Sequence, residues 1–299
     1  MLHVAIHVRW RTPMLAIGML VACGPVPGDR PAQSGSGDTG DLATSTGLSS
    51  ESASETTANT EVDPECPDLV LEGDLAVQSL EDADSLPLYT QVNGYVYVGA
   101  EGLVDLEFLR CLRRVQGQLT LSQNADLMTA HGLEKLEHVG SMRVQYNESL
   151  ESLHALANLH TIDGYALVDG NPSLVSLGLP GLVRVERFEI GYVCGAPHGG
   201  NPVLAEIGGL GSLAEFDGLL IMGNPLLERI DGLEGLEGRI GSSPNPELRF
   251  VISFVGNESL SFEHVDAVLG EADASGTISL GGHCGNLGDE ECGECIPGE

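Results

Sequence analysis

The asparagines of this 299-residue chain constrain its fold more than any other residue type. They stand in one frame: a short alternation of apolar and polar residues precedes the frame position, and a leucine comes three residues after it. The members of this asparagine frame are Asn124, Asn147, Asn171, Asn201, Asn224 and Asn257. The basic spacing of about 23 residues lies within the range of roughly 20 to 29 residues of leucine-rich repeats. This period predicts a solenoid, because one repeat is too short to bury its own apolar face and stacked repeats are not.

The residues around each asparagine predict the path of one coil. Apolar residues stand five and three positions before the asparagine, as Leu119 and Leu121 do before Asn124. Alternation at a period of two is typical of a strand with one buried face. After the asparagine, apolar residues recur at about every third position, for example Leu153 and Leu156. That spacing indicates a return path of short turns or 3₁₀ helix.

The asparagines themselves are expected to be structural. Each stands where the chain leaves a strand, and an amide side chain can both donate to and accept from the backbone groups buried there. Proline follows Asn171, Asn201 and Asn224, and it fixes φ and ends the strand. We therefore predict a ladder of asparagine side chains that continues from coil to coil.

Two insertions interrupt the period. The residues 191–200 separate Ile190 from Asn201, and a proline-rich stretch, Ser242–Pro246, lengthens the spacing before Asn257. Insertions in solenoids become loops on one face, which is often the binding face. Further strands are expected at 94–99, with Glu101 in the place of an asparagine, and at 277–280. The prediction is a β-rich solenoid of about eight coils with one parallel sheet, stacked about 4.8 Å apart.

The N-terminal part of this solenoid carries a family pattern. Cys66-Pro67 precedes the first strand, and Cys111 lies just before the run 115–121, Val-Gln-Gly-Gln-Leu-Thr-Leu. The pattern resembles the opening of the receptor L domain, the ligand-binding solenoid of insulin-receptor and epidermal-growth-factor-receptor ectodomains. The resemblance covers about residues 66–285, and it implies a right-handed, β-helix-like stack in which Cys66 pairs with Cys111. The insertions depart from the family, so the resemblance implies the fold and not the ligand.

Residues 1–22 have the form of a lipoprotein signal peptide. Arg9 and Arg11 precede an apolar run, residues 13–22, that is too short to span a bilayer as a permanent helix. The run ends in Leu20-Val-Ala-Cys23, which is similar to the bacterial lipobox and implies cleavage before Cys23 and its acylation. Gly24, rather than Asp, follows the cysteine, and this resembles the signal for sorting to the outer membrane in Gram-negative bacteria. We predict a lipid anchor in the bacterial cell envelope, with a membrane as partner; a cysteine there by chance is the alternative.

The composition changes between residues 23 and 64. This segment is rich in Ser, Thr, Gly, Asp and Glu and nearly lacks aromatic and bulky aliphatic residues. It cannot bury enough apolar surface to offset the entropy of ordering the chain. We expect a disordered tether that lifts the solenoid, residues 65–299, off the membrane; a glycosylated, mucin-like stalk is the alternative.

Apart from Cys23, six cysteines remain, and an even number in an exported chain indicates disulfides. Three of them form a C-terminal cluster: Cys284, Cys292 and Cys295. We assign the cluster to a cap, about residues 281–299, because the last coil of a solenoid would otherwise expose its core. One disulfide is expected inside the cluster and one between its third sulfur and Cys194. Zinc bound by the cluster and His283 is the alternative, although a second tight cysteine pair is missing.

Charge limits the partners. The chain has a formal net charge of −31, from 44 acidic and 13 basic residues, so it would repel a phosphate backbone and nucleic acid is excluded. Asp163, Glu186 and Asp217 occupy the same strand-entry position in consecutive coils. They predict either a solvated acidic edge or a cation-binding strip. No calcium-loop motif accompanies them, and we predict no metal and no other cofactor.

Residues four and two positions before each asparagine should point away from the core, so they are the candidate binding residues. Three apolar ones, Leu167, Leu220 and Met222, would face solvent, and exposed apolar patches mark interaction sites. The candidate binding face comprises Tyr97, Arg143, Gln145, Leu167, Asp169, Glu189, Leu220 and Met222, with Tyr192 and His198 from the first insertion. Insertion loops that cover this face are the alternative.

The function predicted from these features is binding. A solenoid offers a surface rather than a catalytic pocket, and the sequence has no nucleophile elbow, no Walker phosphate loop and no His-Glu-x-x-His helix, so we predict no enzyme. We expect recognition or adhesion to a protein or glycan partner. The alternatives are a β-helix enzyme acting on polysaccharide, with Asp169, Glu189 and Arg143 as its approximate catalytic group, and a purely structural envelope protein.

Overall fold

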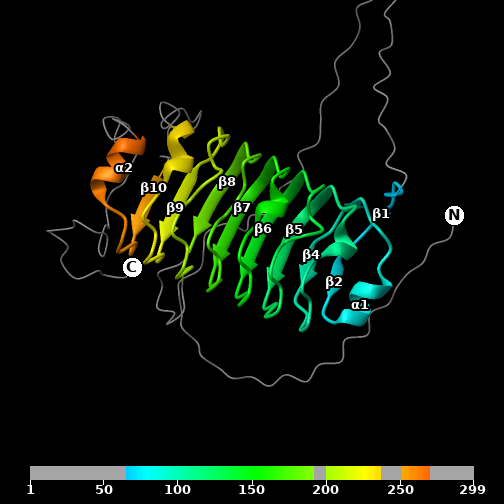
Figure 1. Ribbon diagram of the computed structural model, residues 1–299. Coiled ribbons are helices and arrows are strands. Elements are labelled where there is room, and N and C mark those ends of the chain that lie inside the picture. Colours follow the sequence, from blue (N-terminus) through cyan, green and yellow to red (C-terminus); the bar gives the residue numbers. More distant parts are fainter. Residues whose placement is uncertain (1–64, 192–199, 237–250, 270–299) are drawn as a thin grey trace, which may run out of the picture. The chain divides into compact units, whose positions relative to one another are not determined.

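Parallel strands stack into a single sheet, and the chain returns from each strand to the next through turns and short 3₁₀ helices (Figure 1). The computed structural model describes residues 65–191, 200–236 and 251–269. These residues form the predicted β-solenoid, with about five turns rather than eight coils. Cys23, the proline-rich insertion and the C-terminal cluster lie outside the described residues, as does the strand expected at 277–280.

The described part of the sheet has ten strands. Two short parallel pairs begin it: β1 (Val70–Leu71) with β3 (Gln91–Val92), and β2 (Leu75–Val77) with β4 (Val96–Val98). Six longer strands follow in chain order: β5 (Arg114–Ser122), β6 (His138–Gln145), β7 (Thr161–Asp169), β8 (Arg184–Ile190), β9 (Gly218–Met222) and β10 (Val251–Val255). Thus β4 is the strand expected at 94–99, whereas β1 and β2 were not expected.

The core follows the asparagine frame. Residues five and three positions before the asparagine, such as Leu119 and Leu121, are fully buried. Leucines of the return path are buried in the same way, and burial of each contributes about 1.5–3 kcal/mol. The predicted 3₁₀ turns are present as η1 (Glu107–Leu109), η2 (His154–Leu156) and η3 (Asp231–Leu236).

The predicted asparagine ladder is confirmed, and all six members are fully buried. Nδ2 of Asn147 donates to the carbonyl oxygen of Leu121 at 3.1 Å and to Oδ1 of Asn171 at 3.0 Å. Its Oδ1 accepts from the backbone N–H of Asn124 at 3.2 Å. The pattern repeats as far as Asn257, so each amide satisfies backbone groups of the coil before it. Glu101 does not take this role, because its side chain is exposed.

The first insertion interrupts the repeat period but not the asparagine ladder. Asn201, which follows the insertion, donates from Nδ2 to the carbonyl oxygen of Val168 at 3.1 Å, just as its neighbours do. Gly191 and Gly200 mark the two ends of the insertion and have φ angles of +84° and +87°. An added Cβ at either glycine would collide with backbone of the next coil. The two ends of the insertion are therefore positions that only glycine fits.

The ends of the described stack carry two helices that the sequence did not predict. Helix α1 (Leu80–Ser85) follows β2 and begins at Ser79, whose Oγ accepts from the backbone N–H of Asp82 at 3.1 Å. Helix α2 (Phe262–Leu269) packs beside η3 (Figure 1). The predicted disulfide between Cys66 and Cys111 is present, with an S–S distance of 2.05 Å. None of the helices among the described residues is long and apolar enough to cross a membrane.

Candidate functional site

The residues four positions before Asn147, Asn171 and Asn224 form one row across the sheet with Glu189, which lies twelve positions before Asn201 because of the insertion. Arg143 pairs with Leu167, Leu167 with Glu189, and Glu189 with Leu220. Adjacent strands are about 4.8 Å apart, so the row brings together residues that are far apart in the sequence. The asparagine frame therefore locates the candidate residues on one face of the sheet.

Tyr165 connects the members of this row, although it was not among the candidates. The guanidinium of Arg143 lies over the Tyr165 ring, 5.7 Å from its centroid. The Tyr165 hydroxyl donates to Oε2 of Glu189 at 2.9 Å, and Nε of Arg187 contacts Oε1 of Glu189 at 2.7 Å. We call these four side chains, Arg143, Tyr165, Glu189 and Arg187, the sheet-face network. It crosses three adjacent strands, β6 to β8.

The electrostatics of the network favour a fixed arrangement. Burial raises the pKa of the Tyr165 hydroxyl, and the charge and hydrogen bond of Glu189 raise it further. The phenol therefore keeps its proton and remains a donor. Glu189 is buried and receives both Tyr165 and Arg187, whereas the Arg143 side chain is exposed.

Several candidate residues are less exposed than predicted. Leu167 was expected to face solvent but is only 6% exposed, because the longer side chains of Arg143 and Glu189 flank it in the row. Asp169 and Glu189 are also buried. The half-buried candidates are Tyr97, Gln145, Leu220 and Met222. Tyr192, His198 and Cys194 lie outside the described residues.

Asp169 holds the end of the first insertion. Its Oδ1 accepts from the backbone N–H of Gly200 at 2.7 Å. Burial raises the pKa of the Asp169 carboxyl; hydrogen bonds from Gly200 and Gly170 oppose this, and the charge of Glu189 adds to it. Asp169 and Glu189, the two carboxylates of the predicted enzyme alternative, are thus both engaged by groups of the protein itself.

The acidic strand-entry residues do not converge on a cation site. Oδ2 of Asp163 lies 3.2 Å from Nε2 of His138. Burial and the charge of Arg114 lower the pKa of His138, while Asp163 opposes them. Within the described ranges, no group of three or more histidine, cysteine, aspartate or glutamate side chains could hold a metal ion.

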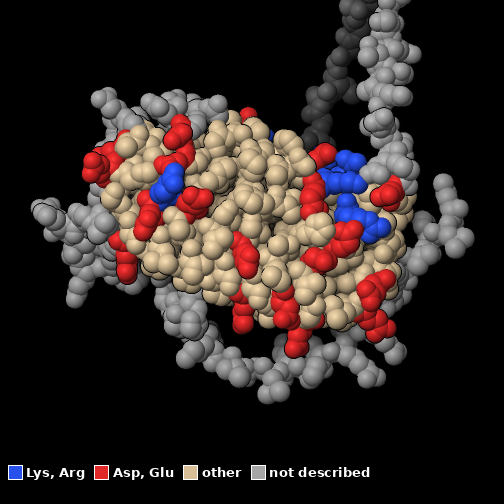
Figure 2. All heavy atoms as spheres, in the orientation of Figure 1, with Lys and Arg blue, Asp and Glu red and all other residues tan. Residues whose placement is uncertain are grey.

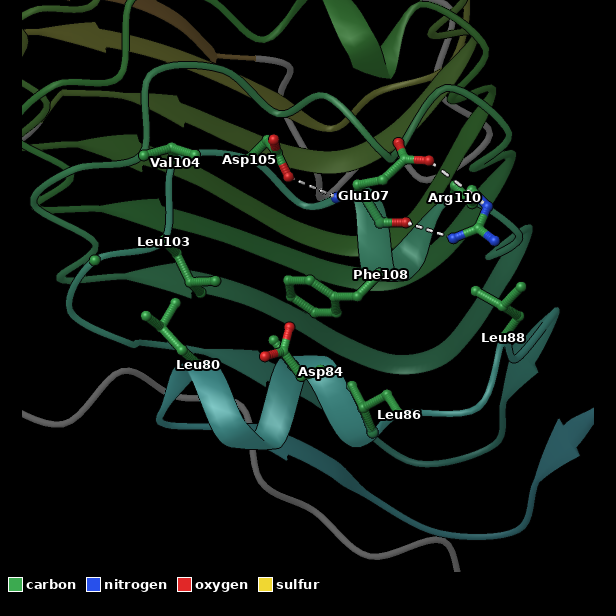
Figure 3. Close-up of a pocket in the computed structure, with 12 residues that line it drawn as sticks. Leu80, Asp84, Leu86, Leu88, Leu103, Val104, Asp105, Glu107, Phe108 and Arg110 are labelled. Carbon is green, nitrogen blue, oxygen red and sulfur yellow. Dashed lines mark hydrogen bonds and ion pairs between the residues drawn. The ribbon is translucent and has the colours of Figure 1, made fainter.

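An open groove of about 400 Å³ lies between α1 and η1 (Figure 3). Leu80 and Val104 line it with side chains that are 49% and 56% exposed. Asp84, Asp105 and Glu107 add carboxylates to its lining. The sequence did not predict this groove. Helix α1 was not predicted, and the other walls of the groove come from the return path, where turns were expected.

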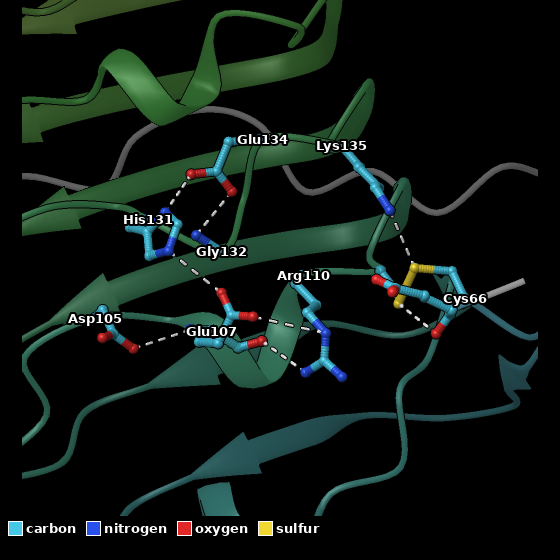
Figure 4. A network of polar contacts seen from close by, with 10 residues as sticks. Cys66, Asp105, Glu107, Arg110, His131, Gly132, Glu134 and Lys135 are labelled. Atoms are coloured by element: carbon cyan, nitrogen blue, oxygen red, sulfur yellow. Dashed lines mark hydrogen bonds and ion pairs between the residues drawn. A yellow bond between two sulfur atoms is a disulfide. The ribbon is translucent and has the colours of Figure 1, made fainter. Parts of the chain in front are cut away.

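A polar cluster beside the groove connects two consecutive coils (Figure 4). Nδ1 of His131 lies 2.7 Å from Oε1 of Glu134, and its Nε2 lies 3.3 Å from Oε2 of Glu107. The hydrogen bond and charge of Glu134 raise the pKa of His131, and Glu107 adds to this. Nearby, Nζ of Lys135 donates to Sγ of Cys66 at 3.2 Å.

Charged side chains are unevenly distributed over the face shown in Figure 2. Acidic side chains are spread around it, whereas basic ones gather near the N-terminal strands and near η3. Ion pairs occur in both basic areas, for example Arg113 with Glu137 at 3.3 Å. These basic side chains are thus largely neutralised by neighbouring carboxylates.

Tyr165, which the asparagine frame does not single out, has a sequence signal of its own. Glycines recur seven positions before the frame position, at Gly117, Gly140 and Gly164, and the strand register shifts beside each of them. Tyr165 directly follows one of these shifts, six positions before Asn171. A search of the sequence for outward residues beyond the fourth position would have found it.

No family model, no curated protein and no solved structure matches the chain. The fold and the site therefore define a class, a parallel β-solenoid with a fixed polar network on the outward face of its sheet.

Proposed function

We propose that this chain is a binding or adhesion module of the bacterial cell envelope that recognises a protein or glycan partner through the outward face of its sheet. In this proposal, acylated Cys23 anchors the chain to the outer membrane and residues 23–64 form the tether. The lipobox-like sequence and the resemblance to receptor L domains support it, as does the absence of enzyme motifs from the sequence.

The observation that carries the proposal is the sheet-face network next to half-buried apolar side chains. Arg143 and Tyr165 are of the residue types that dominate binding energy at protein interfaces. Leu220 pairs with Glu189 across β8 and β9, and Met222 lies two residues further along the same strand. A rigid polar group beside apolar surface is typical of an interface core, because little side-chain entropy is lost on binding.

The proposal predicts that Arg143, Leu220 and Met222 are needed for binding. We would replace all three by serine and measure saturable binding of the full-length chain to envelope fractions of the producing bacterium. We expect at least about tenfold weaker binding, because the variant loses both charge and apolar contact area.

The matched control replaces Met128, Val175 and Leu226 by serine, since these apolar side chains are about half exposed and lie on the return path. The control should bind as the wild type does. Equal binding by the sheet-face variant would refute the proposal, absence of saturable binding by the wild type would favour a structural envelope role, and cleavage of a glycan panel would favour the enzyme alternative.

A further inference from the structure

We infer that Arg143 is a preorganised carboxylate-binding residue, and that the partner is an extended polypeptide segment presenting an acidic and an apolar side chain to this face. The inference rests on the proposed function and names the class of ligand. It follows from the pairing of the arginines, the support beneath Arg143 and the spacing of the strands.

Arg143 differs from most arginines of the described residues. Five of these arginines form ion pairs: Arg110 with Glu107, Arg113 with Glu137, Arg184 with Glu215, Arg187 with Glu189, and Arg229 with Asp231. Arg143 has a ring contact and no carboxylate partner among the described residues, and it is exposed. Arg114 also lacks an ion pair in this part of the chain, but it is half-buried beside His138. In a chain with 44 acidic residues, an exposed arginine without a carboxylate partner in the described part of the chain is unusual.

The network below Arg143 orients its guanidinium. Tyr165 supplies the ring against which the guanidinium lies, Glu189 fixes the Tyr165 hydroxyl, and Arg187 fixes Glu189. A guanidinium carries five N–H donors in a planar fork that matches the two oxygens of a carboxylate. Because the Tyr165 ring restricts this side chain, binding should cost less conformational entropy than it would for a free surface arginine.

The surroundings favour a ligand with an isolated carboxylate over a polyanion. The net charge of −31 repels an extended anionic polymer. The repulsion of a single carboxylate is weaker, because it carries one charge and ions screen that charge from others more than about 8 Å away at physiological ionic strength. The bare face of Tyr165 that a sugar ring would need is partly taken by Arg143. These features favour a polypeptide over an acidic glycan.

The strand spacing sets the pattern of that polypeptide. Arg143 on β6 and Leu220 on β9 belong to the same row and are three strands apart, which corresponds to about 14 Å. An extended segment advances about 3.3 Å per residue, so four residues cover this distance. Residues four apart in an extended segment also point to the same side. The expected segment therefore has Asp or Glu at one position and a large apolar residue four positions away.

A library of random 12-residue peptides displayed on phage, selected on the full-length chain, tests this inference. We expect the enriched peptides to share the acidic and apolar pair at this spacing. The dissociation constant of one such synthetic peptide would then be measured by fluorescence anisotropy. Arg143→Gln should weaken binding at least about tenfold, and Arg143→Lys should weaken it less.

Two controls isolate the proposed contact. Arg184→Gln removes another exposed arginine of the sheet and should leave the dissociation constant unchanged. A peptide with Gln in place of its Glu should bind wild type as weakly as the original peptide binds Arg143→Gln, with no further loss when both changes are combined. Thermal melting would show that Arg143→Gln is folded.

The outcomes separate this inference from the proposed function. Peptides that lose binding with Leu220→Ser and Met222→Ser but not with Arg143→Gln would overturn the role of Arg143 and leave the sheet face as the binding site. Peptides unaffected by any of these changes would overturn both. Arg143-dependent binding of uronic-acid glycans, without selection of acidic peptides, would show that the ligand class is wrong.

Discussion

At the scale of single residues, protonation of two histidines has opposite effects on the stability of the fold. His131 lies between Glu134 and Glu107, and the hydrogen bond that it donates to Glu134 raises its pKa. His138 is half-buried, and its burial lowers its pKa. Protonation of His131 thus favours the folded state, whereas protonation of His138 opposes it.

The prediction at this scale concerns His131→Gln. The stabilisation from the raised pKa of His131 is complete below its unfolded pKa of about 6.5 and is lost as pH rises through the folded value. The melting temperature of the wild type should therefore exceed that of the variant more at pH 5.5 than at pH 8.5. His138→Gln is the matched control and should show the opposite trend, and a pH-independent difference for His131→Gln would contradict the assignment.

At the scale of elements, β8 is the strand at which the regular coil is opened. Strand β8 ends at Ile190, and at Gly200, after the insertion, the Asp169 carboxylate of the preceding strand accepts the backbone N–H. Asp169 was predicted as a binding residue on a shared face, but its burial and its partner assign it to the junction. An outward position in a strand thus binds the residue that ends the insertion.

The prediction at this scale compares two substitutions of Asp169. Asp169→Ala leaves the buried Gly200 N–H without its acceptor and should lower the free energy of unfolding by about 1–3 kcal/mol. Asp169→Asn keeps an acceptor oxygen and removes a buried charge, so it should cost less. Denaturant titration of both variants would measure the difference, and an alanine variant as stable as the asparagine variant would show that the hydrogen bond is unimportant.

At the scale of the whole described stack, each coil contacts only its neighbours, so stability depends on the ends as well as on the interior. The disulfide between Cys66 and Cys111 closes a segment of 45 residues that contains β1 to β4 and α1. It ties these short strands to the start of β5, where the regular coils begin. The N-terminal end of the described stack is therefore crosslinked.

We predict that replacing Cys66 and Cys111 together by serine destabilises this end selectively. Loop-closure entropy gives a loss of about 4 kcal/mol for a loop of this length. Hydrogen exchange should quicken in β1 to β4 and change little in β7 to β9, and mass spectrometry of peptic fragments would measure it. Uniform acceleration along the stack would show that the disulfide stabilises the solenoid as one cooperative unit.

The repeat frame of this chain predicts the direction of its side chains but not how far each is covered. Counting from Asn147 or Asn171 correctly predicts which side chains enter the core, because direction in a strand depends on backbone geometry alone. Counting does not predict how far neighbouring side chains cover a residue. The predicted exposure of Leu167 was therefore wrong, because it depends on Arg143 and Glu189 in other coils. Helix α1 was missed because six residues give too little periodicity to be recognised.

The asparagine ladder allows different residues to determine the stability of the solenoid and its binding specificity. Asn201 makes the bonds of its neighbours although 30 residues separate it from Asn171, against 23 or 24 in a regular coil. Mutation can therefore lengthen, shorten or replace the segment between Gly191 and Gly200 without changing the amides that hold adjacent coils in register. In protein engineering, these two glycines are the natural boundaries at which a foreign loop could be grafted onto this scaffold.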